Sequence, residues 1–344
     1  MDPGAPVARF GGMTAGYESF YLRAAAPSGG QGFWLRHTVR IAPGEHPTGS
    51  LWLTWFDAVR GPTATKLTVP GPEAGEGGLG HWLQIGGATL GEGRAVGAIA
   101  EAPNAAQAQW DLSFTGERRL EHLVPEWLYA APLPRTKPTS LHPFARFAGS
   151  VSIGGEHHDI DDWPGMVGHN WGAQHAERWI WLHGMHFDGA GDDTWIDVAL
   201  GRVRAGPVLL PWLASGAISL RGDRIPLGGI GRFPRLSVAE RPTGALLRLP
   251  GPAGMTVRVE VGAPRERFVG WNYADPDGRT HDVANCSIAG IELTVRSPSG
   301  PGTVLSAAGT AAYELGMREV DHGITIQPFA DAPRGAPEPP DPPA

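Results

Sequence analysis

We predict an all-β, mainly antiparallel protein with few helices from three features of the sequence. Short segments in which apolar and polar residues alternate are common, whereas apolar residues spaced by three and four, as on a helix, are rare. The 344 residues include 50 glycines and 33 prolines with no Gly-X-Y period, which is typical of many tight turns. Strands at short spacing with such turns favour a β-barrel or β-sandwich over βαβ units.

The alternating segments give the expected strands in chain order, which include 32–41, 50–58, 108–113, 179–187, 194–203, 245–249 and 255–261. Segments 70–78 and 250–254 are predicted turns, because glycine supplies positive φ and proline fixes φ while withholding a donor. Glu314, Arg318 and His322 are spaced by four, as on one face or at the end of a helix, and we interpret them as a surface ion pair.

The length suits two domains of roughly 150 residues each. The segment 132–140 is polar, carries three prolines and is interpreted as a connector. We therefore expect an N-terminal β domain over 1–165 and a C-terminal β domain over 166–331. The remaining 332–344 is rich in proline and acidic, so we expect a disordered tail.

Composition excludes several classes of partner and compartment. The formal net charge of -7 and the charged fraction of 18% argue against nucleic-acid binding, which needs a basic excess. The lone Cys286 excludes an intramolecular disulfide and a cysteine-rich zinc site. The sequence shows no secretory signal and no long apolar run, so we expect a cytoplasmic protein. An apolar substrate would still bring it into transient contact with membranes.

The residues suited to chemistry are concentrated in one part of the chain. Six of the thirteen histidines lie between His157 and His186, and five of the thirteen tryptophans lie between Trp163 and Trp195. Within this part, two strand-like segments flank DGAGDD, which is a strong hairpin signal.

Alternation along the hairpin places the candidate side chains on strand faces. Trp179, Trp181 and His183 share one face of the first strand, and Trp195 and Asp197 share one face of the second. One register places His186 beside the second set, and a slip of one residue places His183 there instead. The sequence leaves both registers open.

The block GMVGHNWGAQHAERWIWLHG resembles the His-x-Trp-Gly block and following Trp-x-Trp strand of carotenoid 1,2-hydratases (hydroxyneurosporene synthases). Tocopherol cyclases carry a similar Asn-Trp-Gly before a Trp-rich strand. The resemblance implies two lipocalin-like β domains and a cavity for a polyene or prenyl chain. It also implies functional roles at the matching positions His169, Trp171, Trp195 and Asp197. Trp195 stands where the hydratases have tyrosine, so any role of a phenol hydroxyl is lost.

The predicted function is a cofactor-independent, acid-catalysed hydration or cyclisation of an alkene in a terpenoid, carotenoid or prenylquinone. An apolar pocket would raise the pKa of Asp197 and keep it protonated as the proton donor. Trp171 and Trp195 would stabilise the carbocation, and His169 would accept the proton of the nucleophile. Further expected substrate contacts are Trp179, Trp181, Asn170, His183 and His186.

Other interpretations of the same residues remain open. The barrel could serve as a non-catalytic carrier of a hydrophobic ligand, since fold does not fix function. His175, His183, His186 and Asp188 offer ligands for a metal-dependent hydrolase or oxygenase, although no HExxH spacing is present. Within the glycine-rich GHNWG, His169 could be a structural turn residue, and the acidic 157–162 a solvated turn.

Overall fold

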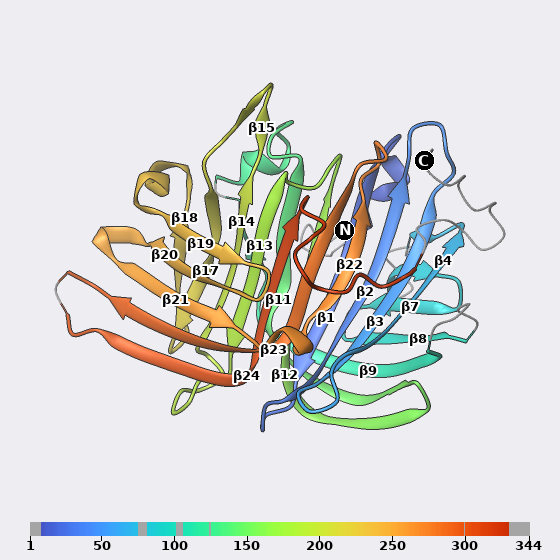
Figure 1. Ribbon diagram of the computed structural model, residues 1–344, viewed down its shortest axis with the longest axis horizontal. Helices are drawn as coiled ribbons and strands as arrows, with labels where there is room; N and C mark the ends of the chain where they lie inside the picture. The colour runs from blue at the N-terminus through green and yellow to red at the C-terminus, as the bar shows by residue number, and fades with distance from the viewer. Residues whose placement is uncertain (1–7, 75–80, 101–105, 124, 299, 330–344) are drawn as a thin grey trace.

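The computed structural model describes residues 8–74, 81–100, 106–123, 125–298 and 300–329. Two large antiparallel sheets dominate these residues, which confirms the predicted all-β fold (Figure 1). The predicted disordered tail lies outside the described residues. In the described part of the chain, no helix has the length and apolar character needed to cross a membrane. The helical elements of the described residues are five short 3₁₀ helices, η1 (Phe10–Gly12), η2 (Glu126–Tyr129), η3 (Ile230–Arg235), η4 (Pro252–Gly254) and η5 (Arg265–Arg267).

The first sheet holds twelve strands in the order β4-β3-β2-β1-β12-β11-β9-β8-β7-β6-β5, with β10 paired to β11. The two longest strands, β11 and β12, form its centre, where β12 also pairs with β1. The bounds are β1 (Gly16–Ala25), β2 (Gln31–Ile41), β3 (Thr48–Asp57), β4 (Thr63–Pro70), β5 (Glu73–Ala74), β6 (His81–Ile85), β7 (Ala88–Gly91), β8 (Arg94–Ile99), β9 (Ala108–Gly116), β10 (Leu120–Glu121), β11 (Thr136–Ile153) and β12 (Glu156–Gly172).

The second sheet holds ten strands in the order β18-β17-β14-β13-β24-β23-β21-β20-β19, with β22 paired to β23. The chain passes from the first sheet to the second between Gly172 and Arg178. The bounds are β13 (Arg178–Met185), β14 (Trp195–Arg202), β17 (Leu213–Leu220), β18 (Asp223–Gly228), β19 (Ser237–Arg241), β20 (Gly244–Pro250), β21 (Thr256–Gly262), β22 (Val269–Ala274), β23 (Thr280–Arg296) and β24 (Thr303–Met317), beside a small hairpin of β15 (Arg204–Ala205) and β16 (Val208–Leu209).

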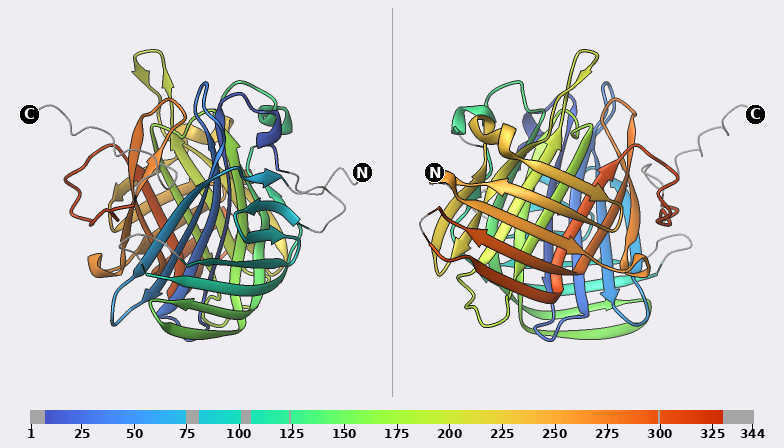
Figure 2. Two further views of the ribbon diagram at one scale, coloured as in Figure 1. Left: turned by 90° about the vertical axis from the view of Figure 1, so that its right-hand side faces the viewer. Right: turned by 60° about the vertical axis from the view of Figure 1, so that its left-hand side comes forward.

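Both sheets curl strongly without closing into barrels (Figure 2). In the described residues, the hydrogen-bonded path of the first sheet ends at β4 and β5, and that of the second at β18 and β19. The concave side of the first sheet holds its own apolar core, in which Phe20, Phe33 and Phe147 are fully buried. A second core fills the other sheet and includes Trp34 and Trp52 of the first sheet.

The face of the first sheet that turns away from its own core packs on the second sheet, and β23 contacts β1, β2 and β3. Alternation along β1 and β2 places one set of side chains on this face, namely Tyr17, Ser19, Tyr21, Arg23, Trp34, Arg36, Thr38 and Arg40. The ring of Tyr21 lies 5.3 Å from that of Trp181, and Trp34 lies 6.1 Å from Trp271. We call the side chains between the two sheets the intersheet layer.

Four local expectations were wrong. The predicted connector 132–140 holds the start of β11 at Thr136, and both 157–162 and the GHNWG block lie inside β12. Glu314 lies in β24, not on a helix. The glycines of β12 were interpreted as turn residues. Gly168 instead makes room for the Tyr21 ring of the neighbouring strand, since a Cβ at this position would lie 2.2 Å from that ring.

Candidate functional site

The hairpin of β13 and β14 has the register that places His183 opposite Asp197. Met185 lies opposite Trp195, and His186 follows the end of β13 with a φ of 55°. Of the two registers that the sequence left open, the structure therefore has the one with His183 beside Asp197.

Asp197 is fully buried in the intersheet layer, and both of its carboxylate oxygens accept hydrogen bonds. The Ser140 hydroxyl donates to Oδ2, and Trp181 Nε1 donates to Oδ1 over 3.1 Å. His122 Nε2 lies 3.4 Å from Oδ2. Burial alone would raise the pKa of Asp197, but His122 and Ser140 together hold it below its ordinary value. A lowered pKa favours the ionised carboxylate, whereas the acid-catalysed scheme requires a protonated one.

His183 joins the two sheets through a second buried contact. Its Nε2 donates to the Pro143 carbonyl over 2.7 Å, and its Nδ1 lies 3.1 Å from Arg23 Nη1. Arg23 also donates to the carbonyls of Ser287 and Thr310. Burial and the neighbouring guanidinium lower the pKa of His183 to about 4, so its imidazole is neutral near pH 7. These bonds leave His183 without a free nitrogen.

His169 lies in a different environment, on the concave side of the first sheet. Its Nε2 is 2.7 Å from Glu18 Oε1, and its ring stacks on Phe20 and Trp171 at 4.0 and 4.8 Å. Glu18 is fully buried and also accepts the backbone N–H of Arg9.

The sheet separates His169 from Asp197. His169 pairs with Thr139, and the next residue, Ser140, faces the other way and donates to Asp197. Trp171 lies two positions after His169 on β12, so the two side chains point to the same face of the strand. The structure therefore does not bring the predicted acid and base onto one substrate.

The remaining predicted side chains lie in the intersheet layer. Trp195 is fully buried, and its Nε1 donates to Glu117 Oε2 over 3.1 Å. These contacts indicate that it packs between the two sheets. Trp179 donates to Glu314 over 2.9 Å. Asn170 pairs with Ser19 on β1, and its buried Oδ1 has no hydrogen-bond partner among the described residues.

A cavity opens within the intersheet layer, where β1–β3 meet β22 and the segment between β12 and β13. The space inside it that the centre of a water molecule can reach is about 20 Å³, and its mouth opens toward solvent. Its lining is aromatic and polar, and includes Tyr17, Arg36, Ser50, Trp52, His175 and Tyr273.

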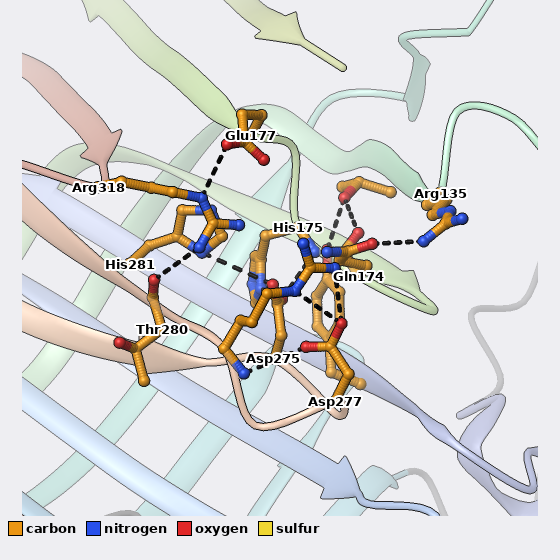
Figure 3. Close-up of polar contacts among 12 residues, drawn as sticks. Arg135, Gln174, His175, Glu177, Asp275, Asp277, Thr280, His281 and Arg318 are labelled. Atoms are coloured by element: carbon orange, nitrogen blue, oxygen red, sulfur yellow. Dashed lines mark hydrogen bonds and ion pairs between the residues drawn. The ribbon is translucent and has the colours of Figure 1, made fainter. Parts of the chain in front are cut away.

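His175 lines this cavity and pairs with the buried Asp275 (Figure 3). His175 Nδ1 lies 2.7 Å from Asp275 Oδ1, which also accepts the backbone N–H of His175 over 2.9 Å. Tyr17 stacks on the imidazole at 4.0 Å. The other ring nitrogen, Nε2, is buried and has no hydrogen-bond partner among the described residues.

A tight turn positions Asp275. It follows β22 directly, and its backbone N–H donates to the Arg279 carbonyl over 2.7 Å. Gly278 has a φ of 83°, the left-handed conformation that glycine adopts without strain. The DPDG sequence is suited to such a turn.

The charge states suit proton transfer at His175. Burial lowers the pKa of His175 by more than the Asp275 carboxylate raises it, so the ring is neutral near pH 7. Burial raises the pKa of Asp275, but the hydrogen bonds that it accepts from His175 lower it on balance. An ionised Asp275 that accepts the Nδ1 proton leaves a lone pair on Nε2.

His281 completes a cluster that also has the composition of a metal site. Its Nδ1 lies 3.7 Å from Asp275 Oδ2, and neither of its nitrogens has a hydrogen-bond partner in the described residues. One ligand atom each from His175, Asp275 and His281 lie within 4.8 Å of one another. The sequence had grouped His175 with His183, which instead contacts Arg23.

Glu314 supports the cavity from behind. It accepts hydrogen bonds from Trp179 Nε1, from the Tyr273 hydroxyl over 3.2 Å and from Asn285 Nδ2 over 3.0 Å. Sequence reasoning missed Asp275, because it lies 100 residues from His175 and only the packing of the sheets brings them together. The polar ADPDGRTH stretch was the one available signal.

Comparisons with known proteins bear on the fold. No family model matches the chain. An "Uncharacterized protein Rv0493c" of Mycobacterium tuberculosis is 27% identical over 321 residues, which cover 91% of this chain and 90% of that protein. The crystal structure of a provisionally named AttH protein (NE1406) from Nitrosomonas europaea has a TM-score of 0.53 at 13% identity, covering 92% of this chain and 95% of that chain. Kievitone hydratase from Nectria haematococca has a TM-score of 0.49 at 8% identity, with 92% of each chain covered. At these identities the likeness extends to the fold alone.

Proposed function

We propose that the protein adds water, or a hydroxyl group of the substrate, across a carbon–carbon double bond in the intersheet cavity. His175 is the general base. The observation that carries this proposal is the unpartnered Nε2 of a neutral imidazole whose Nδ1 proton is held by Asp275 at the cavity wall. A carboxylate that fixes one imidazole tautomer in this way prepares the other nitrogen to accept a proton. The resemblance of the His-Asn-Trp-Gly block to hydratases and cyclases supports the class of reaction.

The proposed step conserves atoms and charge. His175 Nε2 takes a proton from the attacking oxygen, which forms the new C–O bond. The π electrons move to the neighbouring carbon, and the imidazolium returns the proton to that carbon. Because negative charge develops on carbon, the double bond must be conjugated to an electron-withdrawing group such as a carbonyl.

This scheme differs from the acid-catalysed one that the sequence favoured. Protonation of an unactivated terpenoid or carotenoid alkene needs a strong proton donor in contact with it. Asp197 is fully buried, ionised and hydrogen-bonded through both oxygens. We propose that Asp197 acts as a structural link between the sheets, and that His169 stabilises the first sheet through Glu18.

Incubation with an organic extract of the host cells in deuterated, ¹⁸O-labelled water tests the proposal. A product that gains both labels with wild type and loses them with His175→Gln supports hydration by this base. Deuterium without ¹⁸O indicates cyclisation at the same site. His157→Gln is a matched control, since this exposed histidine lies on the far hairpin of β11 and β12. A compound that co-purifies unchanged, with no label in any product, would favour a hydrophobic-ligand carrier.

A metal-dependent hydrolase or oxygenase is a second candidate, favoured by the cluster of His175, Asp275 and His281. Two imidazoles and a carboxylate suit zinc or iron, and buried His281 leaves both nitrogens unpartnered. Elemental analysis of the purified protein separates the candidates. A stoichiometric transition metal that is lost in Asp275→Asn and His281→Gln would replace the general-base proposal.

A further inference from the structure

One cation in the intersheet layer has a position that the reaction at His175 does not explain. Arg36 on β2 is 4% exposed and lines the cavity. Its guanidinium carbon lies 4.1 Å from the centroid of the Tyr273 ring and 5.7 Å from that of Trp52. Nη2 donates to the Ser19 hydroxyl over 2.8 Å, whereas the buried Nε has no hydrogen-bond partner among the described residues.

In the part of the chain that the structure describes, Arg36 also lacks an acidic partner. Within the described residues, no carboxylate oxygen lies within 4.0 Å of its guanidinium. Two acids beside the cavity already have other donors: Asp275 accepts from His175, and Glu314 accepts from Tyr273 and other groups. A buried charge without a counter-ion is costly, so folded proteins pair such groups.

The side chains that line the cavity also include no acid. Its lining contains two guanidinium groups, Arg36 and Arg40, and no aspartate or glutamate. The Arg40 side chain is 21% exposed and reaches Glu45 at 3.9 Å, outside the lining. The facing titratable groups from other elements are Tyr17, His175 and Tyr273, of which none is an anion near pH 7.

We propose that Arg36 binds an organic carboxylate of the substrate, so that the ligand is an anion with an adjacent double bond. This inference rests on the proposed reaction at His175, which shares the cavity with Arg36. A planar guanidinium forms paired hydrogen bonds with a carboxylate. The same cation then lies next to the carbon on which negative charge develops, and attracts that charge in the transition state.

Crotonate and its neutral isostere crotonamide test the inference in the full-length protein. At constant ionic strength, we expect crotonate to bind about 10- to 100-fold more tightly, because hydrogen bonds to charged groups are the stronger ones. Quenching of tryptophan fluorescence reports binding, since Trp52 lines the cavity. Arg36→Met should abolish the preference, and Arg36→Lys should keep part of it. Arg94→Met, which removes an exposed arginine paired with Asp111, should keep all of it.

Three results would overturn the inference. They are equal binding of the two probes by wild type, a preference that survives in Arg36→Met, and displacement of crotonate by equimolar phosphate, which would assign the site to an inorganic anion. The comparison in wild type stands even where Arg36→Met does not fold. His175→Gln should lose label incorporation and retain the preference for crotonate, so the failure of the base and the failure of the anion site are separable.

Discussion

Replacing Asp197 by alanine tests whether this carboxylate links the two sheets. The substitution removes the acceptor of two buried donors, the Ser140 hydroxyl and Trp181 Nε1 at 3.1 Å. It also removes the negative charge 3.4 Å from His122 Nε2. Because all these groups are buried between the sheets, water cannot replace the lost acceptor without opening the junction.

The expected loss follows from these contacts. An unpaired buried donor costs about 1–3 kcal/mol, and two donors therefore cost about 2–6 kcal/mol. Removing one partner of a buried ion pair typically costs about 3–5 kcal/mol, which falls in the same interval. Asp197→Asn keeps an acceptor for Trp181 and can donate to a rotated Ser140 hydroxyl, so we expect a loss of only about 1–2 kcal/mol.

Urea unfolding of wild type, Asp197→Asn, Asp197→Ala and Trp181→Phe measures these losses, and the Asp197→Ala, Trp181→Phe cycle measures the coupling of the pair. Label incorporation in deuterated, ¹⁸O-labelled water is measured on the same samples. The structural role predicts that Asp197→Asn keeps its activity in proportion to its folded fraction. If Asp197→Asn is fully folded and inactive, Asp197 is the catalytic acid that the sequence predicted and our reasoning is refuted.

Two further predictions concern stability. The pKa of buried His183 is about 4 when folded and about 6.5 when unfolded, so the unfolded chain binds more protons between these values and stability falls as pH decreases through them. Between pH 7.5 and pH 5, the protonation of His183 in the unfolded chain lowers the free energy of unfolding by about 2 kcal/mol. The urea midpoints at the two pH values check this loss. An unchanged or higher midpoint at pH 5 would contradict it. A Cβ at Gly316 would lie 2.2 Å from the Trp179 ring, so Gly316→Ala must displace that ring from Glu314 and cost about 1–3 kcal/mol. Thermal unfolding beside Gly87→Ala, where nothing lies within 4 Å, checks this, and equal Tm values would refute it.

The alternation of side chains was sufficient to predict the fold class, because it depends on local spacing. It also predicted that Trp181 and His183 share a face. It could not predict the long strands β11 and β12, whose glycines and prolines have the composition of turns. In β12 the space beside Gly168 is filled by Tyr21 of another strand, which no local pattern reveals.

The candidate site was harder to predict, since it depends on contacts between the sheets. His175 appeared in the sequence only as a possible metal ligand, and its partner Asp275 comes from the turn after β22. The matched block placed His169 and Asp197 in one mechanism, although Thr139 and Ser140 turn their side chains to opposite faces. A motif that resembles a family identifies which segment of the chain carries candidate residues. The strand face on which each side chain lies determines which of them can contact the same substrate.

The protonation state of His175 tests the central claim most directly. In ¹⁵N NMR spectra at pH 7, assigned by comparison with His175→Gln, we expect a neutral ring with the proton on Nδ1 and a deprotonated Nε2, as its bond to Asp275 requires. Asp275→Asn should weaken this preference for one tautomer. An imidazolium at pH 7, or a neutral ring with the proton on Nε2, would leave no lone pair on Nε2 and would contradict His175 as the base.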